Sequence, residues 1–234
     1  MLLRKIEDAS DAGVDWLQIR EKDLSAKDCA TLTREALQRV ARSPSTAAAA
    51  VVTAAKSPLR ATEAGAAEPA VTGAAAAKFS SNRTMPARIL VNDRLDVAMS
   101  ENAGGVHLSD KSLPVAEAKR LADSQAGGRD FLVGVSCHSL EDAKSAEAGG
   151  ADYLFFGPVF ATPSKTAFGA PQGLELLAEV CRVVSVPVLA IGGVTLENSS
   201  ACVAAGASGI AAIRLFQDAR DMPALVQALR KIDR

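Results

Sequence analysis

Short apolar runs without polar alternation recur along this 234-residue chain, and a segment with helical spacing follows each of them. Uninterrupted apolar runs of this length are typical of strands buried on both faces, as in parallel sheets. Repeated strand–helix units therefore predict an α/β fold. The predicted strands cover residues 15–20, 89–93, 105–109, 131–136, 153–157, 187–193 and 209–213.

Seven predicted strands are one short of the eight that close a β/α barrel. The predicted helices cover residues 2–12, 26–41, 94–102, 114–123, 139–149, 174–183, 196–205 and 222–232. We expect one barrel domain over 1–234 that either lacks its first strand or fills that place with something else.

Residues 43–87 interrupt the alternation, and sixteen of these 45 residues are alanine. A segment of this length without a clear pattern is uncommon inside a compact domain. Its composition favours a disordered surface insertion. The alternative is that residues 47–55 form an additional helix or strand.

Composition and charge exclude several classes of protein. With 26 basic and 27 acidic residues the net charge is −1, which argues against a nucleic-acid-binding surface. The chain has no signal-peptide pattern and no apolar stretch approaching about 18 residues, so we expect no membrane span. The four cysteines form no metal-binding spacing, which predicts free buried thiols in a reducing cytoplasm and no zinc site.

Polar side chains follow the first two predicted strands. Alternation along the first strand directs Gln18, Arg20 and Lys22 to one side. Asn92 and Asp93 end the second strand, where Asp93 is either a Mg²⁺ ligand or the N-cap of the next helix. In β/α barrels the strand ends carry the chemistry.

Two histidines lie in or after the next predicted strands. His107 is inside its strand, which favours a hydrogen-bonded core residue. Ser136 and His138 end the following strand on one side, and Ser139 is a candidate helix cap. His138 is a candidate acid–base residue, because the ordinary pKa of histidine lies near neutrality.

Two candidate anion-binding loops follow the next pair of strands. The first carries Thr162, Ser164 and Lys165, whose hydroxyls and cation suit diphosphate oxygens. The second carries Gly192 and Gly193, where bare backbone lets amides approach a phosphate at a helix N-terminus. Phosphate binding near the last strands is a recurrent feature of these barrels.

Five motifs occur in an order that resembles the thiamine phosphate synthase/thiazole tautomerase superfamily. They are QIREK, VNDR, GVHL, GADYLFFGPVFATPSK and PVLAIGGVT. The resemblance covers nearly all of the chain except residues 43–87 and implies a (β/α)8 barrel of the TIM type.

The resemblance implies a synthase that joins a pyrimidine diphosphate to a thiazole phosphate, releases pyrophosphate and uses Mg²⁺. It implies that Asp93 carries the metal, that Ser136 faces the pyrimidine and that Gly192 and Gly193 bind the thiazole phosphate. The residues implied for the diphosphate are Gln18, Arg20, Lys22, Asn92, Thr162, Ser164 and Lys165. We take Ser136, His138 and Lys165 as the catalytic candidates.

Three departures from the synthase pattern resemble the tautomerase branch. Ser112 occupies the place of the second metal-binding aspartate, and Asp110 is the candidate substitute. The Lys-x-Asp pattern is absent after the hydroxyl loop, and Arg214 occupies the place of a phosphate-binding serine. In a tautomerase His138 would be the acid–base residue.

We predict a synthase acting on small molecules, without nucleic-acid or membrane partners, and leave a homodimer open. A thiazole tautomerase and a non-catalytic phosphate-binding barrel are the alternatives.

Overall fold

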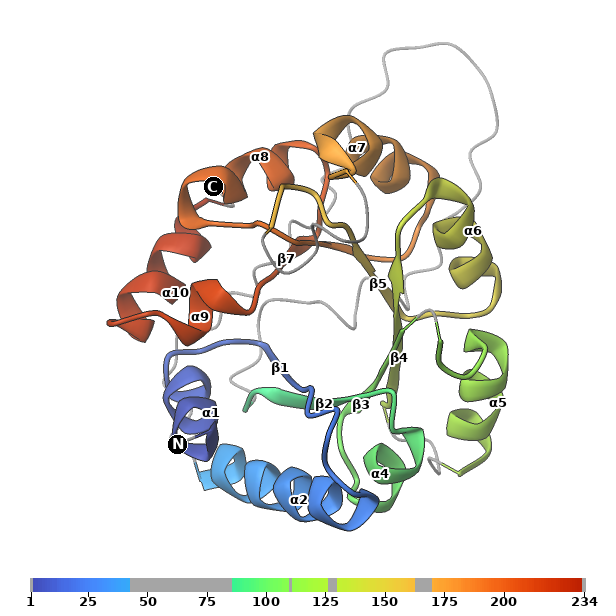
Figure 1. The fold of residues 1–234 in the computed structure, drawn as a ribbon, viewed down its shortest axis with the longest axis vertical. Coiled ribbons are helices and arrows are strands. Elements are labelled where there is room, and N and C mark those ends of the chain that lie inside the picture. Colours follow the sequence, from blue (N-terminus) through green and yellow to red (C-terminus); the bar gives the residue numbers. More distant parts are fainter. Residues whose placement is uncertain (1, 43–85, 110, 126–129, 163–169, 233–234) are drawn as a thin grey trace.

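The computed structural model describes residues 2–42, 86–109, 111–125, 130–162 and 170–232. Its seven strands pair in chain order, each parallel to the next, and curl into a barrel-like sheet (Figure 1). This confirms the predicted parallel α/β architecture. The strands are β1 (Trp16–Ile19), β2 (Arg88–Asn92), β3 (Gly105–Leu108), β4 (Leu132–Cys137), β5 (Tyr153–Phe156), β6 (Val188–Ile191) and β7 (Gly209–Ala211).

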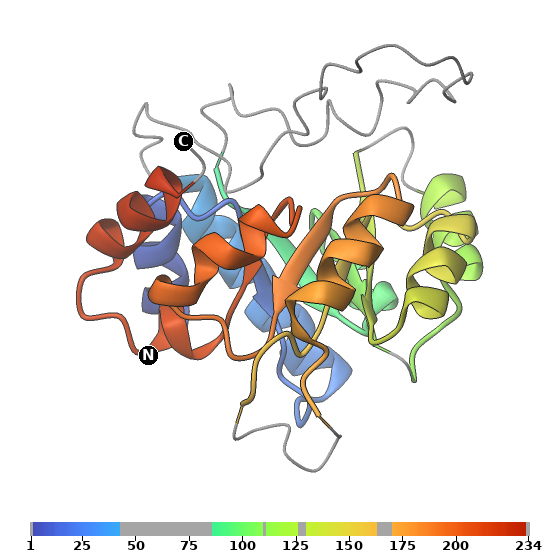
Figure 2. The same cartoon turned by 90° about the horizontal axis from the view of Figure 1, so that it is seen from above.

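Helices surround the sheet on its outer side, as the two perpendicular views show (Figures 1 and 2). They are α1 (Leu2–Asp11), α2 (Ala26–Arg42), α4 (Leu95–Ser100), α5 (Val115–Gln125), α6 (Leu140–Ala148), α7 (Gly173–Val183), α8 (Leu196–Ala204), α9 (Arg214–Gln217) and α10 (Met222–Lys231). None of the helices described is both long and apolar enough to cross a membrane.

The strands contribute to two layers, because successive side chains point to opposite faces. The outward layer packs under the helices and includes Val106, Val133 and Leu154. The inward layer fills the barrel and contains Leu90, Leu132, Tyr153, Phe155 and Leu189. Burial on both faces explains why the strands read as continuous apolar runs.

The curled sheet stays open between its first and last strands. In the described part of the chain, β1 pairs only with β2 and β7 only with β6. Helices α1 and α10 adjoin at this edge (Figure 1). Arg230 of α10 donates a hydrogen bond to the carbonyl of Gly13, and its Nη2 lies 3.6 Å from Asp15 Oδ1. Helix–helix contact therefore spans the gap in the sheet.

Several predicted boundaries differ from the structure by one or two residues, and the short helix α9 was not predicted. The last strand ends at Ala211 instead of residue 213, and α9 begins at Arg214, because Ile213 turns out of the sheet with an αR backbone and is half exposed. The predicted insertion overlaps the described residues only at its end, where Ala87 is buried beside Ile89. Residues 43–85, which include the alternative element at 47–55, lie outside the described residues.

All four cysteines are buried and free, as predicted. Burial raises the pKa of the Cys137 thiol to about 12 and that of Cys202 to about 11. Both thiols are therefore protonated near neutral pH and act as small apolar side chains.

Candidate functional site

Four polar side chains lie inside the barrel near the carboxyl ends of the strands, a region that we call the barrel mouth. Gln18 lies two residues beyond Trp16 on β1, and Asn92 lies two residues beyond Leu90 on β2, so both point inward like those core residues. His107 and Ser136 contact each other from β3 and β4. The predicted position near a strand end is confirmed for Gln18, Asn92 and Ser136, whereas His107 lies within its strand, as also predicted.

A chain of hydrogen bonds links β1, β2 and the loop after β3. Gln18 Nε2 donates to Asn92 Oδ1 at 2.6 Å, and Asn92 Nδ2 donates to Asp93 Oδ2 at 2.6 Å. The other oxygen, Asp93 Oδ1, accepts from the backbone N–H of Ser109 at 2.7 Å. The carboxylate is thus fixed between two neighbouring strand ends.

The helix-cap alternative for Asp93 is wrong. The N-cap of α4 is Arg94, which makes no side-chain cap, and Asp93 bonds toward β3 instead. Its φ of 58° is left-handed, a conformation that Asp and Asn tolerate better than most residues because their short side chains bond locally. This strained backbone turns the carboxylate toward the barrel mouth and away from the helix.

Two cations follow Gln18 along the chain, beyond the end of β1. Arg20 and Lys22 are exposed, and neither forms an ion pair within the described part of the chain. The positive charge of Arg20 contributes to lowering the pKa of His107, so the guanidinium is near enough to act on the barrel interior. Both cations are therefore available to an anionic ligand at the barrel mouth.

His107 is a buried core histidine with both ring nitrogens bonded, as its place in the strand predicted. Its Nδ1 lies 3.1 Å from Tyr153 Oη and its Nε2 lies 2.9 Å from Ser136 Oγ. Burial lowers its pKa to about 3, although the charge of Asp93 acts in the opposite direction. The imidazole is neutral at physiological pH and is not an acid–base group in that range.

His138 follows β4 and is half-buried. Its Nδ1 bonds the carbonyl oxygen of Gly157, and its backbone N–H donates to Asp142 at 3.1 Å. Ser139 caps α6 by accepting from the N–H of Asp142 at 3.0 Å, which confirms the predicted cap. If Nδ1 carries the proton, as a bond to a carbonyl requires, Nε2 keeps a free lone pair.

The glycine pair after β6 packs against the loop after β5. Gly192 and Gly193 have φ of 92° and 66°, which favour glycine. A Cβ on Gly192 would lie 2.5 Å from Pro158, and one on Gly193 would lie 2.7 Å from Phe160. Close contact between the two loops therefore requires this glycine pair, in addition to the predicted approach of a phosphate.

The remaining predicted site residues are less fully described. Thr162 is half-buried and Arg214 is exposed at the start of α9. Ser164, Lys165 and Asp110 lie outside the described residues. Their places at the site stay predictions.

The residues at the barrel mouth fit a metal ion only in combination with a ligand. The described residues contain no cluster of three or more His, Cys, Asp or Glu side chains that could hold one. Asp93 offers one carboxylate, and each of its oxygens already accepts one hydrogen bond. Mg²⁺ is commonly bound by one or two carboxylates plus substrate phosphates, so Asp93 beside a diphosphate suits it.

Sequence reasoning missed Tyr153 and Gly134. Tyr153 lies within an apolar run and is the only tyrosine of the chain, which is the signal that could have marked it. A Cβ on Gly134 would lie 2.0 Å from the Tyr153 ring. Glycine therefore makes room for the ring that reaches His107.

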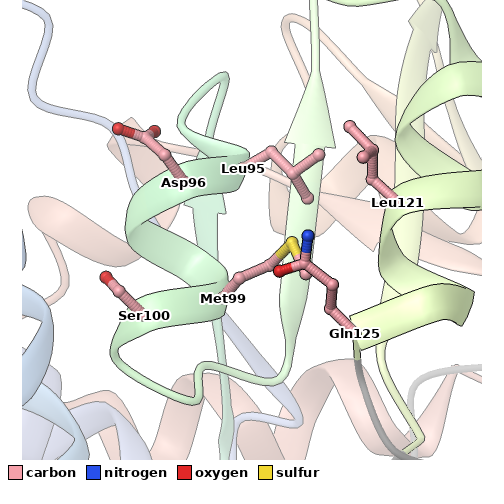
Figure 3. A pocket seen from close by; sticks show the side chains of 6 residues that line it. All are labelled: Leu95, Asp96, Met99, Ser100, Leu121 and Gln125. Carbon is pink, nitrogen blue, oxygen red and sulfur yellow. The ribbon is translucent and has the colours of Figure 1, made fainter.

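A surface pocket of about 440 Å³ lies between α4 and α5, outside the barrel (Figure 3). It is lined by Leu95, Asp96, Met99, Ser100, Leu121 and Gln125. Leu95 and Leu121 point toward each other across it (Figure 3). None of the predicted site residues lines this pocket, so we assign the site to the barrel mouth.

Comparison with known proteins decides the family. Residues 45–216 match the family described as thiamine monophosphate synthase. The chain belongs to this family. The match spans most of the barrel, from before β2 to α9, and includes the strand ends of β2 to β6.

Similar proteins support the assignment to the thiamine monophosphate synthase family. A Geobacter sulfurreducens protein is 36% identical over 212 residues, which cover 91% of this chain and 78% of that protein. The thiamine-phosphate synthase of Methanocella arvoryzae is 45% identical over 143 residues, covering 61% of this chain and 65% of the relative. A solved structure, the thiamine phosphate pyrophosphorylase from Pyrococcus furiosus, superposes with a TM-score of 0.71 at 26% identity. The superposition covers 100% of this chain and 89% of that structure.

Proposed function

We propose that this chain is a thiamine-phosphate synthase that couples a pyrimidine diphosphate to a thiazole phosphate and releases pyrophosphate. The observation that carries the proposal is the hydrogen-bonded chain from Gln18 through Asn92 to Asp93, with Arg20 and Lys22 beyond it. A carboxylate held by hydrogen bonds, together with cations that form no ion pair among the described residues, suits a metal-bound diphosphate. Membership of the family and the named relatives support it.

The reaction breaks the C–O bond between the methylene carbon of the pyrimidine and the diphosphate. The electron pair of that bond leaves with the diphosphate, and the thiazole ring nitrogen donates a pair to the methylene carbon. The leaving group gains negative charge, so cations aimed at it lower the barrier most. We assign this role to Arg20 and Lys22, and to Lys165 on the loop after β5.

The remaining residues orient the two substrates. We assign Gln18, Asn92, Thr162 and Ser164 to the diphosphate oxygens, and Ser136 to the pyrimidine. Gly192, Gly193 and Arg214 are assigned to the phosphate of the thiazole. Bare backbone before α8 suits this last role, because N–H groups at a helix N-terminus bind anions.

Mg²⁺ is the proposed cofactor, held by Asp93 and by Asp110. When bound, the ion neutralises charge on the diphosphate oxygens and so stabilises the leaving group. The chain itself fixes the Asp93 carboxylate through Asn92 and Ser109, so the metal would not have to order it.

We also propose a cytoplasmic location. Four buried free thiols suit a reducing compartment.

The direct test is incubation of the purified chain with both substrates and Mg²⁺, with continuous detection of pyrophosphate. We expect release that requires both substrates and stops when a chelator removes the metal. Release with the pyrimidine diphosphate alone would indicate a hydrolase, and no release at saturating substrates would refute the proposal.

A second candidate function, thiazole tautomerase, is favoured by one observation. His138 is anchored through Nδ1, and Nε2 has no hydrogen-bond partner among the described residues, so this nitrogen is available to take up or give a proton. Isomerisation removes a proton from one position of the thiazole and returns it at another, so it needs such a group. The coupling reaction needs charge stabilisation instead.

The substitution His138→Asn separates the two functions. We expect coupling to stay within about tenfold of wild type, and any thiazole isomerisation to fall by roughly 10²–10⁴, the usual contribution of a general acid–base group. A chain that isomerises rapidly through His138 but never releases pyrophosphate is a tautomerase.

A further inference from the structure

Three polar groups from three neighbouring strands form a line inside the barrel. Tyr153 on β5 contacts Nδ1 of His107 on β3, and Nε2 of His107 contacts Ser136 on β4. Gly134 of β4 lies between the other two strands, because it pairs with His107 on one side and with Tyr153 on the other. The missing side chain at Gly134 is what lets the Tyr153 ring approach His107.

The direction of the hydrogen bonds follows from burial. Tyr153 is fully buried, and His107 Nδ1 is the one hydrogen-bond partner of its hydroxyl in the described part of the chain. Burial raises the pKa of Tyr153 far above its ordinary value, so the phenol keeps its proton. A buried O–H donor without an acceptor is strongly disfavoured, so Tyr153 donates to Nδ1.

A neutral imidazole has one donor and one acceptor nitrogen. If Nδ1 accepts from Tyr153, the ring proton is on Nε2 and is donated to Ser136 Oγ. The opposite tautomer would leave the Tyr153 proton unpaired, which disfavours that tautomer on the order of tenfold. Aromatic rings hold the imidazole in place, with the Phe155 centroid 4.1 Å from that of His107.

We propose that Tyr153 and His107 are positioning residues that prevent Ser136 from donating its proton to His107, and so keep that proton for the ligand at the barrel mouth. Ser136 is half-buried, so its hydroxyl is accessible from the barrel mouth. A serine hydroxyl has one hydrogen and two lone pairs, so when one lone pair accepts from His107 Nε2–H, the hydrogen still needs an acceptor, which the ligand can supply. The inference rests on the proposed function, since the ligand it concerns is the pyrimidine.

The consequence is selectivity between two kinds of heterocycle. An aminopyrimidine has ring nitrogens with free lone pairs, which accept a hydrogen bond. In the corresponding oxopyrimidine one ring nitrogen carries a proton and donates. Where Ser136 faces the ring nitrogen that differs between them, it binds the first better. To accept from the protonated nitrogen of the second, it would have to turn its remaining lone pair to the ligand and leave its own hydrogen unpaired.

The first experiment reads the tautomer in the wild-type protein without any ligand. Isotope-labelled imidazole nitrogens distinguish protonated from unprotonated sites by NMR, and with two histidines in the chain, His138→Asn assigns the signals. We expect His107 to be protonated at Nε2 and unprotonated at Nδ1 from pH 6 to pH 8. Protonation at Nδ1 would overturn the proposal.

The second experiment measures the dissociation constants of the aminopyrimidine alcohol and of its oxopyrimidine counterpart by calorimetry. We expect wild type to prefer the aminopyrimidine by at least about tenfold. The double variant His107→Phe/Tyr153→Phe removes both partners together, so no buried polar group is left unpaired. In this variant the Ser136 hydroxyl can rotate, and we expect the preference to fall to within about threefold.

Phe155→Leu is the matched control, because it changes the packing around His107 without touching its hydrogen bonds. We expect this variant to keep the wild-type preference. An unchanged preference in the double variant, or an equal loss in Phe155→Leu, would overturn the role in selectivity. If neither pyrimidine binds wild type, the proposed function fails, and with it the role in selectivity, while the tautomer measurement still decides the hydrogen-bond direction.

Discussion

Removing the charge of Asp93 tests whether this residue binds a metal ion or has only a structural role in its loop. Asp93→Asn removes the charge but keeps an oxygen for the Ser109 N–H and tolerates the φ of 58°. We expect pyrophosphate release to fall by at least about a hundredfold, because stabilisation of the leaving diphosphate is lost. Steady-state assays over a range of Mg²⁺ concentrations measure this.

The matched control for Asp93 is Asp96→Asn. Asp96 is an exposed carboxylate nearby, paired with Arg94 at 2.6 Å outside the barrel. We expect it to have no more than a small effect on release. Equal losses in the two variants would mean that the reaction depends on the negative charge of this region and not on a metal ligand at Asp93.

His107 links the stability of the protein to pH. Its pKa falls from the ordinary 6.5 to about 3 on folding, so the unfolded chain binds a proton that the folded one does not. The stability this neutral imidazole contributes is complete above about pH 6.5 and is lost as pH falls toward 3. We expect the free energy of unfolding to drop by about 2 kcal/mol between pH 7 and pH 5 from this group alone.

Urea denaturation at both pH values tests this linkage. The double variant His107→Phe/Tyr153→Phe lacks the titrating imidazole, so its pH dependence should be smaller than that of wild type by this amount. Parallel curves for the two proteins would show that His107 is not the group responsible.

At the scale of elements, the contact between the loops after β5 and β6 depends on Gly192. Backbone N–H groups of Val159 and Phe160 donate to carbonyls of Ile191 and Gly192 at 2.9 and 3.0 Å, so the two loops form one unit. A methyl group on Gly192 would clash with Pro158, and the φ of this position is unfavourable for any residue with a side chain.

We expect Gly192→Ala to lower the free energy of unfolding by at least about 2 kcal/mol more than Gly173→Ala does. Gly173 is the matched control: its φ is 78°, but a Cβ there meets nothing within 4 Å. The comparison therefore isolates the steric contact from backbone strain. Chemical denaturation of both variants gives the difference, and equal losses would mean that the loops separate without cost.

At the scale of the whole molecule, β1 and β7 do not pair, so we expect the contact between α1 and α10 to contribute to the stability of the fold. Arg230 is mostly buried there, with 12% of its side chain exposed, and it bonds Gly13 and approaches Asp15. We expect Arg230→Ala to reduce the free energy of unfolding by about 1–3 kcal/mol, since it leaves a carbonyl and a carboxylate without this donor. Lys231→Ala, on the exposed side of the same helix, should change it by less than about 0.5 kcal/mol.

Urea denaturation measures both variants. An unchanged free energy of unfolding in Arg230→Ala would mean that apolar packing alone holds the two ends of the open sheet together.

The sequence by itself determined the order and type of the strands and of the described helices other than α9. Uninterrupted apolar runs can be satisfied only by strands covered on both faces, so each predicted strand lies within one or two residues of an observed one, as β3 does. The sequence also placed Gln18, Asn92, Asp93 and Ser136 at strand ends, because parallel strands bring those ends to one side of a barrel.

Only the tertiary structure decided which of these residues act together. A strand that is apolar on both faces carries no periodic signal for which side points inward, so Tyr153 read as one more core residue. Likewise, Asp93 could have capped its own helix by local rules, but its partner, Ser109, comes from the loop after the next strand. Hydrogen bonds between residues distant in sequence depend on register and on the space left by a residue such as Gly134, and the barrel fixes both only when it is assembled.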